Sequence, residues 1–297
     1  NRKKALVKAS TFKHYAVALK HVKSYLKHQY KVTDIDINEV DNQFVLDYDF
    51  YLRTEKKVGN NKAIRYVKTL AGLFRTTLEN GWISKDPFVN YKKSKVVKDV
   101  VFLTQEEIDA IYNKKISNKS LERVKDLFIF STYTSLAYCD VKELKKEHIV
   151  KNIDGYRWIK IARRKSEVVC DIPLLPIAEE IIKKYEKDPL VINSGKLLPV
   201  LSNQKINIFL KDVGDLCGIS KKLHFHMSRH NFGSTIAAAN RLPIETMMRI
   251  MGHKTTTQAR HYAKISTAMI VDDVAALRKK IEENKERSDE ENKNVAV

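Results

Sequence analysis

The sequence of 297 residues has little of the material from which several protein classes are built. Its cysteines are Cys139, Cys170 and Cys217, an odd and widely spaced set that argues against a disulfide framework and for a reducing compartment. With 9 glycines and 6 prolines, it is neither collagen-like nor of low complexity. No apolar run approaches the ~18–20 residues of a membrane span, so we expect no membrane partner.

Motifs for common cofactors are missing as well. No pair of cysteines or histidines has the spacing of a zinc site, and no GxxxxGK[ST] phosphate loop occurs. Between residues 226 and 262, where several histidines gather, Glu245 is the one carboxylate, which disfavours a two-metal nuclease. We therefore expect no metal, no cofactor and no use of ATP.

Positive charge is what the sequence has in excess. It contains 55 Lys and Arg against 36 Asp and Glu, a net charge of +19, and its pI is near 9.6. A pI above ~9 is typical of a nucleic-acid binder. Hydrophobic residues make up 43%, which is enough for a real core. A net charge of +19 destabilises the compact state by self-repulsion. We therefore favour a polyanionic partner over a merely soluble basic protein.

Two domains are the default expectation for this length. Helical periodicity in 10–30, 41–57 and 60–80 predicts a helical N-terminal domain, 1–83. Residues 84–102 carry many lysines without periodicity and predict a basic linker. On the third helix, the side chains expected to contact DNA phosphates are Lys62, Arg65 and Lys68, although a solvated face fits the same pattern.

The second domain, 103–280, combines helices with a strand pair, and a charged tail, 281–297, follows it. Thr104 and Glu107 have the spacing of a capping box, which marks a helix start. Strands are expected at 156–162 and 167–174, joined by a short polar hairpin. Further helices are predicted at 121–133, 137–144, 176–187, 203–216, 228–240, 243–251 and 255–263. The fold class is therefore mainly α with a small antiparallel β-sheet.

Within this domain, five side chains form a chemically coherent set. Lys165 lies at the hairpin tip, His226 and Arg229 open a helix, His253 follows Gly252, and Tyr262 comes nine residues later. Singly, such residues are more often packed or solvated than catalytic. Together they offer cations, imidazoles and a phenol, which is what phosphodiester chemistry needs. A phenol with an ordinary pKa near ~10 needs help from nearby cations or a base.

This order of motifs resembles the tyrosine recombinases, the phage-integrase family, and within it the integrases of conjugative transposons and related mobile elements. The similarity covers roughly residues 10–275 and implies a helical, SAM-like core-binding domain before a mixed α/β catalytic domain. The chain begins with Asn1, and we expect an N-terminal arm-binding domain to precede it. The matching blocks are LTQEEI, YTSLAYCDVKEL, RRKSEVVCDIPL, HFHMSRHNFGSTIAAA and MGHKTTTQARHYAKI.

The resemblance also implies a role for each residue of the set. Tyr262 would attack the scissile phosphate, forming a 3′-phosphotyrosine and freeing a 5′-hydroxyl. Arg229 would bind the non-bridging oxygens and His226 would assist removal of the phenol proton. His253 would donate to a phosphate oxygen, and Lys165 would protonate the leaving 5′-oxygen. Arg164, beside Lys165, is expected to contact DNA.

Partners follow from the same resemblance. It implies double-stranded DNA with attachment or core sites, a homotetramer in the synaptic complex, and accessory DNA-bending and directionality factors. The place of action would be the bacterial cytoplasm, at the nucleoid.

One family residue is missing. The family has a first arginine in T-G-L-R, where this chain reads Thr134-Ser135-Leu136-Ala137. Losing one such donor costs ~3–4 kcal/mol of transition-state stabilisation. We expect another cation, Arg123 or Arg163, to take the place of the residue missing at Ala137, or the site to work with one arginine fewer.

Two other functions fit parts of the pattern. A type IB topoisomerase would share the nucleophile without pairing two DNA sites, and a DNA-binding regulator would lack the chemistry. A covalent protein–DNA adduct separates the regulator from both enzymes.

Overall fold

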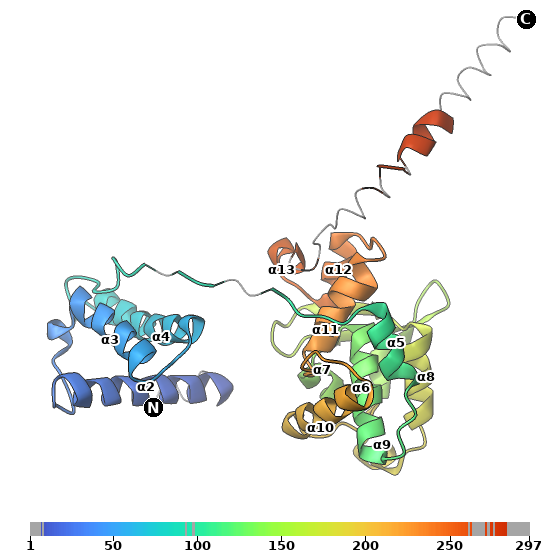
Figure 1. Ribbon diagram of the computed structural model, residues 1–297, viewed down its shortest axis with the longest axis horizontal. Coiled ribbons are helices and arrows are strands. Elements are labelled where there is room, and N and C mark those ends of the chain that lie inside the picture. Colours follow the sequence, from blue (N-terminus) through green and yellow to red (C-terminus); the bar gives the residue numbers. More distant parts are fainter. Residues whose placement is uncertain are drawn as a thin grey trace, which may run out of the picture. The chain divides into compact units, whose positions relative to one another are not determined.

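The computed structural model describes residues 7, 9–92, 94–96, 99–260, 262, 271, 274–275 and 277–283. It divides into two compact units, 1–99 and 100–297, and each unit has its own hydrophobic core (Figure 1). The division falls inside the segment predicted to be a linker. No helix of the described residues is long and apolar enough to cross a membrane.

The N-terminal unit consists of helices that pack around aromatic side chains. Tyr25, Phe44 and Tyr48 are buried between them, with Tyr25 in contact with both other rings. Asp41 begins the middle helix by accepting a hydrogen bond from the N–H of Phe44 at 2.8 Å. The three predicted helices are confirmed with small shifts at their ends. The elements are α2 (Ala9–Gln29), η1 (Ile37–Glu39), α3 (Asn42–Thr54) and α4 (Asn60–Glu79).

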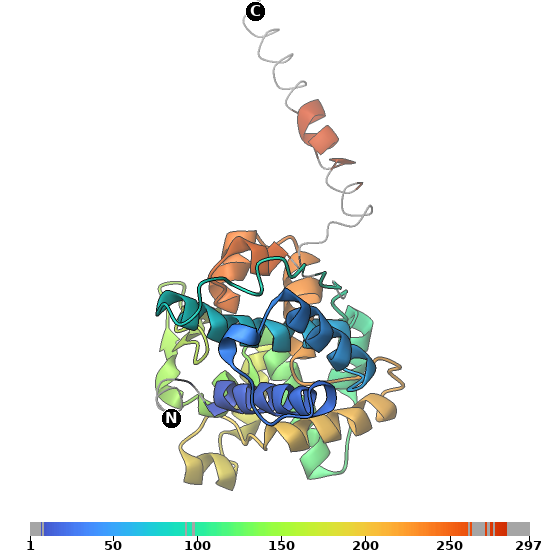
Figure 2. The ribbon, with the colours of Figure 1, turned by 90° about the vertical axis from the view of Figure 1, so that its left-hand side faces the viewer.

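The C-terminal unit is built around α6, which is buried at every position from Val124 to Thr134. A helix without an exposed face over these residues lies inside the unit, and α6 packs against α5, α8, α10 and α11. In both ribbon views α12 and α13 lie at one end of this unit and α10 at the other (Figures 1 and 2). The helices are α5 (Gln105–Asn113), α6 (Lys119–Thr134), α7 (Tyr138–Glu143), η2 (Lys146–His148), α8 (Pro176–Tyr185), α9 (Pro189–Ser194), α10 (Asn203–Leu216), α11 (Met227–Asn231), η3 (Phe232–Ala238), α12 (Ile244–Met251) and α13 (Thr256–Arg260).

The sheet is antiparallel and has the order β1-β2-β3. β2 pairs with β3 from Trp158 opposite Pro173 to Ala162 opposite Val169, so the predicted hairpin is confirmed. The first strand was missed because it is too short to show alternation. Helix α12 packs against β3, which brings the β2–β3 turn to the end of that helix. The strands are β1 (Ile149–Lys151), β2 (Arg157–Ala162) and β3 (Val169–Pro173).

Two expected elements differ in detail. The helix predicted at 228–240 is α11 followed by a π-helix, η3, a geometry frequent at functional sites. The predicted tail starts inside helical backbone at 281–283, and its remainder, 284–297, lies outside the described residues.

The capping box of α5 is confirmed, since Thr104 and Glu107 each bond the other's backbone N–H. The predicted fold class, mainly α with a small antiparallel sheet, is confirmed.

Candidate active site

Elements far apart in sequence meet at one end of α6. Arg229 comes from α11, which packs on α6, and a pair of buried hydroxyls, Ser131 and Ser228, joins the two helices at 2.6 Å. The side chain of Asn231 accepts from the N–H of Leu103 at 2.8 Å and so holds α11 to the start of the unit. These contacts fix the backbone from which Arg229 projects.

Arg229 is 5% exposed and its guanidinium is held on two sides. Nη1 donates to the carbonyl oxygen of Ser135 at 2.8 Å, and Nη2 donates to that of Met251 at 2.5 Å. Ser135 follows α6 and Met251 ends α12. The last carbonyls of a helix carry partial negative charge, so both helix ends stabilise the cation.

Arg163, in the β2–β3 turn, reaches the same carbonyl. Its Nη1 donates to the oxygen of Met251 at 2.6 Å, and the side chain is 8% exposed. Because Arg229 donates to that oxygen as well, the two donor nitrogens lie within about 5 Å of each other. The structure therefore brings together a pair of buried guanidinium groups at the end of α12.

Asp140 balances part of this charge. Its Oδ2 lies 2.7 Å from Nε of Arg163, and its Oδ1 accepts the backbone N–H of Arg164 at 3.1 Å. Asp140 is 1% exposed and lies on α7, three residues after Ala137. It thus fixes both the Arg163 side chain and the backbone of the turn.

Gly252 is needed for this packing. It ends α12 with a φ of 60°, and a Cβ placed there would lie 2.4 Å from Sγ of Cys170 and 2.7 Å from Cγ of Arg163. The glycine therefore admits Arg163 to the end of α12, and it permits the left-handed turn that leads to His253.

The electrostatics favour an anion between the two arginines. Burial, followed by the charge of Arg163, lowers the pKa of Arg229 to about 10, so the group stays charged at neutral pH. Two buried cations facing one carboxylate leave net positive charge in a site shielded from water. A phosphodiester oxygen would relieve this repulsion and accept bidentate hydrogen bonds.

Tyr262 lies beside the arginines, in a turn after α13. It is 8% exposed, and its hydroxyl lies 3.0 Å from Nδ1 of His230. Burial raises the pKa of the phenol, and the charges of Arg229 and Arg163 oppose this. The phenol therefore carries its proton at neutral pH and must lose it to act as a nucleophile.

Three imidazoles, those of His226, His230 and His253, lie around the phenol with different contacts. The ring of His253 is parallel to that of Tyr262 with centroids 6.1 Å apart. Its buried Nδ1 has no hydrogen-bond partner among the described residues. His226 is exposed and packs edge-on against His230 at 4.8 Å. Desolvation first, and then nearby positive groups, lower the pKa of all three, to about 4 for His230 and His253. All three are therefore neutral at pH 7.

The contacts of two residues differ from those expected. His230, and not His226, is the imidazole in contact with the phenol of Tyr262. The signal was present, because His230 lies one helical turn after His226 and shares its face. Arg123 does not reach the site, because its Nη2 pairs with Asp188 at 3.0 Å near the start of α6. At ~1.5 Å per residue, it is ~17 Å from Thr134 along the helix.

The remaining predicted residues are exposed. Lys165 lies in the β2–β3 turn, and its charge contributes to the lowered pKa of His226. Arg164, in the same turn, lies 3.9 Å from Glu143. Lys62, Arg65 and Lys68 are exposed on α4 in the N-terminal unit.

Ser135 takes the place of the glycine in the T-G-L-R motif, and its backbone conformation shows what this change costs. It has a φ of 58°, a left-handed conformation that costs a residue with a side chain about 1–2 kcal/mol. Glycine, the family residue, avoids this cost. The serine hydroxyl lies 3.2 Å from Nη1 of Arg229, which offsets the strain with an additional contact to that cation.

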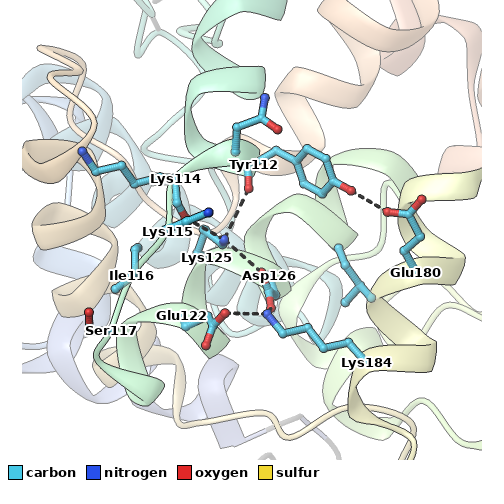
Figure 3. A pocket seen from close by; sticks show the side chains of 12 residues that line it. Tyr112, Lys114, Lys115, Ile116, Ser117, Glu122, Lys125, Asp126, Glu180 and Lys184 are labelled. Carbon is cyan, nitrogen blue, oxygen red and sulfur yellow. Dashed lines mark hydrogen bonds and ion pairs between the residues drawn. The ribbon is translucent and has the colours of Figure 1, made fainter.

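A second group of charges lies at the opposite end of α6. A cavity of about 490 Å³ is lined by residues of α5, α6, α8 and the segment between α5 and α6. Figure 3 shows the side chains that line it. The buried ammonium of Lys125 donates to the carbonyls of Tyr112 and Lys114 at the end of α5. Lys184 donates to Asp126 at 2.6 Å. These charges join the three helices, and we assign them a structural role.

Gly233, the second residue of η3, permits the placement of the phenol. A Cβ there would lie 2.5–2.9 Å from ring atoms of Tyr262. We expect Gly233→Ala to displace that ring and to slow DNA cleavage by about 10²-fold, the usual effect of a misplaced reacting group. DNA affinity and the melting temperature should change little. A matched control is Gly72→Ala, where a Cβ meets nothing within 4 Å. Equal cleavage rates for both variants would contradict the placement.

No group of His, Cys, Asp and Glu side chains in the described residues is arranged to hold a metal ion. The site is instead a set of cationic and neutral nitrogen donors around a phenol.

Comparisons with known proteins find similar sequences and similar folds. The chain is 21% identical over 223 residues to the tyrosine recombinase XerC of Oceanobacillus iheyensis (strain DSM 14371), which covers 71% of this chain and 72% of that protein. Its fold is similar to that of the Tn1549 transposon integrase in complex with a circular intermediate DNA, with a TM-score of 0.71, 15% identity and coverage of 93% and 96%. It is also similar to a lambda integrase dimer bound to a COC′ core site, with a TM-score of 0.68, 17% identity and coverage of 87% and 89%.

Two protein-family models together match most of the chain. Residues 1–96 match the phage integrase SAM-like domain. Residues 101–269 match the phage integrase family, and this range includes the arginine pair and Tyr262. The chain therefore belongs to the phage integrase family, the tyrosine recombinases.

Proposed function

We propose that this protein is a site-specific DNA recombinase that cleaves and rejoins double-stranded DNA to integrate and excise a mobile element. The observation that carries the proposal is the phenol of Tyr262, 3.0 Å from a neutral imidazole and beside two buried arginines. This combination supplies a nucleophile, a proton acceptor and an oxyanion site in one place.

The reaction is a transesterification at phosphorus. The hydroxyl oxygen of Tyr262 attacks the scissile phosphate, and its proton passes to Nδ1 of His230, which is presented as an acceptor when the ring proton is on Nε2. The bond from phosphorus to the 5′-oxygen breaks, and Lys165, from the exposed turn, supplies the proton to that oxygen. The products are a 3′-phosphotyrosine and a 5′-hydroxyl, and the reverse reaction with a new 5′-hydroxyl joins the exchanged strands.

Charge on the phosphate is balanced by three residues. Arg229 and Arg163, whose guanidinium groups lie at the end of α12, bind the non-bridging oxygens. His253, whose ring is parallel to that of Tyr262, donates a hydrogen bond to the phosphate. His226, exposed at the edge of the site, lies against His230 and assists it in transferring the proton. Each of these roles is part of the proposal.

Arg163 takes the place of the missing first arginine in this proposal. Three observations support it: burial at the site, the ion pair with Asp140, and the carbonyl shared with Arg229. The arginine of the β2–β3 turn thereby replaces one that the family carries after α6, at the position of Ala137.

The proposal extends to domains, partners and place. The domains are a core-binding domain, 1–83, a linker, 84–102, a catalytic domain, 103–280, and a tail, 281–297. The substrate is DNA with attachment or core sites, bound by a homotetramer with bending and directionality factors in the bacterial cytoplasm. Support comes from the excess of positive charge and from the DNA complexes of the lambda and Tn1549 integrases.

A nicked substrate tests the proposed activity. When the strand is nicked just beyond the scissile phosphate, the short fragment with the 5′-hydroxyl diffuses away and the covalent adduct accumulates. We expect an SDS-resistant adduct on a nicked duplex from the element's own end, and none on a duplex of unrelated sequence. A stable complex without any adduct would contradict the proposed activity and favour a non-catalytic DNA-binding protein.

The same assay tests what the site requires. We expect full adduct formation in EDTA without ATP, because two arginines balance the phosphate charge and the phosphotyrosine conserves the energy of the broken bond. The measurement is the initial rate of adduct formation with and without Mg²⁺. A strict requirement for Mg²⁺ in the first cleavage step would show that the arginine pair does not perform this role.

A further inference from the structure

A cluster of histidines on the N-terminal unit lies outside the site described above. His14 and His21 are two helical turns apart on α2, and both rings pack on Tyr66 of α4. The ring of His14 is stacked on that of Tyr66 at 5.6 Å, and the ring of His21 is tilted against it at 4.7 Å. Tyr66 is 3% exposed, while both histidines are half-buried at the surface.

Hydrogen bonding fixes the tautomer of the neutral His14 ring. The hydroxyl of Thr69 donates its one proton to the carbonyl of Arg65 at 2.9 Å, so it accepts from Nε2 of His14 at 2.8 Å. The neutral ring therefore carries its proton on Nε2 and keeps Nδ1 as the position that takes up a second proton.

The charged groups that act on both histidines are cations. On His14 the acting charge is Arg65 of α4. On His21 the charges are Lys56, Lys62 and Lys20, which come from the segment after α3, from α4 and from α2. All four side chains are exposed. Desolvation first, and then these cations, lower the pKa of both histidines, so both are neutral at pH 7 in the free protein.

We propose that this cluster, His14 and His21 with Lys20, Lys56, Lys62 and Arg65, is a proton-dependent contact for the DNA backbone, which binds phosphates with both imidazoles charged. The inference rests on the proposed function, since it assumes a DNA substrate. Phosphates placed among these cations would cancel the part of the lowered pKa that the cations cause, and the face of Tyr66 would stabilise each imidazolium.

The sign of the pH dependence follows from linkage. Because the DNA complex holds more protons than the free protein, affinity rises as the pH falls through the pKa of the complex, and it levels off below the pKa of the free histidines. Each histidine whose pKa rises by about one unit on binding contributes about tenfold to the affinity at low pH. At high pH both rings are neutral in the free protein and in the DNA complex, so they add no proton-linked affinity.

The experiment compares full-length proteins that all carry Tyr262→Phe, so that no adduct forms. Fluorescence anisotropy measures their affinity for a labelled duplex of mixed sequence between about pH 5.5 and about pH 8. We expect the variant with His14→Gln and His21→Gln to have the DNA affinity of its parent near the upper end of this pH range. Near the lower end its affinity should be at least about tenfold lower than that of the parent. Histidines of the active site titrate equally in both proteins, so the difference isolates the cluster.

His28→Gln is the matched control. His28 is exposed on the same helix, but its ring packs on Tyr51 instead of Tyr66. This variant should keep the pH dependence of the parent. Equal slopes for the double variant and its parent, an equal loss of affinity at every pH, or the same effect from His28→Gln would each overturn the proposal.

A second measurement does not depend on substitutions. NMR titration of the imidazole signals of His14 and His21 should give higher pKa values in the DNA complex than in the free protein, and unchanged values would overturn the proposal. The covalent adduct on the nicked substrate is independent of this outcome. An active recombinase without proton-linked binding would therefore refute the cluster and leave the proposed function intact.

Discussion

Replacing Tyr262 with phenylalanine is expected to abolish covalent adducts on the nicked substrate and to leave DNA affinity unchanged. The variant loses one hydroxyl, the nucleophile in our account, and retains the ring that packs over Gly233 and beside His253. The expected loss is complete within the detection limit, because phenylalanine has no oxygen with which to form a phosphate ester. SDS gels measure the adduct, and anisotropy measures the affinity.

The matched control for this result is Tyr138→Phe. Tyr138 lies next to Ala137, and its hydroxyl donates to the carbonyl of Leu201 at 3.0 Å, away from the phenol of Tyr262. We expect this variant to form adducts at the rate of the parent. If adducts persist in the Tyr262 variant and vanish in the Tyr138 variant, the nucleophile is assigned to the wrong residue.

Removal of Arg163 is the second change with a large expected effect. Arg163→Ala should slow cleavage by at least ~10²-fold, the typical effect of losing one donor at a developing charge. Arg123→Ala should cleave normally, because that side chain pairs with Asp188 far along α6. Cleavage rates on the nicked substrate and DNA affinities, measured in parallel, separate catalysis from binding.

Stability must be followed in the same series. Arg163→Ala leaves Asp140 buried without its partner, a change that costs about 3–5 kcal/mol in comparable pairs. Arg163→Lys keeps the positive charge and so avoids most of that penalty, but it cannot reproduce the planar set of donors. We expect the lysine variant to fold like the parent and still cleave slowly. Normal cleavage by both variants, with acceleration by Ala137→Arg, would mean that the site works with one arginine fewer.

The fold was largely predictable because its signals are local. The helices of the N-terminal unit follow apolar periodicity, and α5 begins at a capping box whose two bonds are formed. The hairpin of β2 and β3 follows from β-branched and aromatic residues around a polar joint. In contrast, β1 spans Ile149–Lys151, which is too short for an alternating pattern to stand out.

The site was predictable as a set of residues and not as a set of contacts. The order of motifs predicted Tyr262 and Arg229 as site residues, but the sequence could not decide between Arg123 and Arg163. That decision depends on β3 packing against α12, which brings the β2–β3 turn to Met251. Which histidine contacts the phenol, His230 or His226, likewise depends on where the turn after α13 places Tyr262. Such tertiary contacts have no local sequence signal.

Peptide mapping of the trapped adduct tests the central claim most directly. After nuclease and protease digestion of the complex formed on the nicked substrate, mass spectrometry identifies the residue that carries the nucleotide. Our account predicts a single modified peptide in which Tyr262 is esterified through its phenolic oxygen to a 3′-phosphate. A nucleotide on Tyr133 or Tyr138, or attachment through the 5′ end of the cleaved strand, would contradict it.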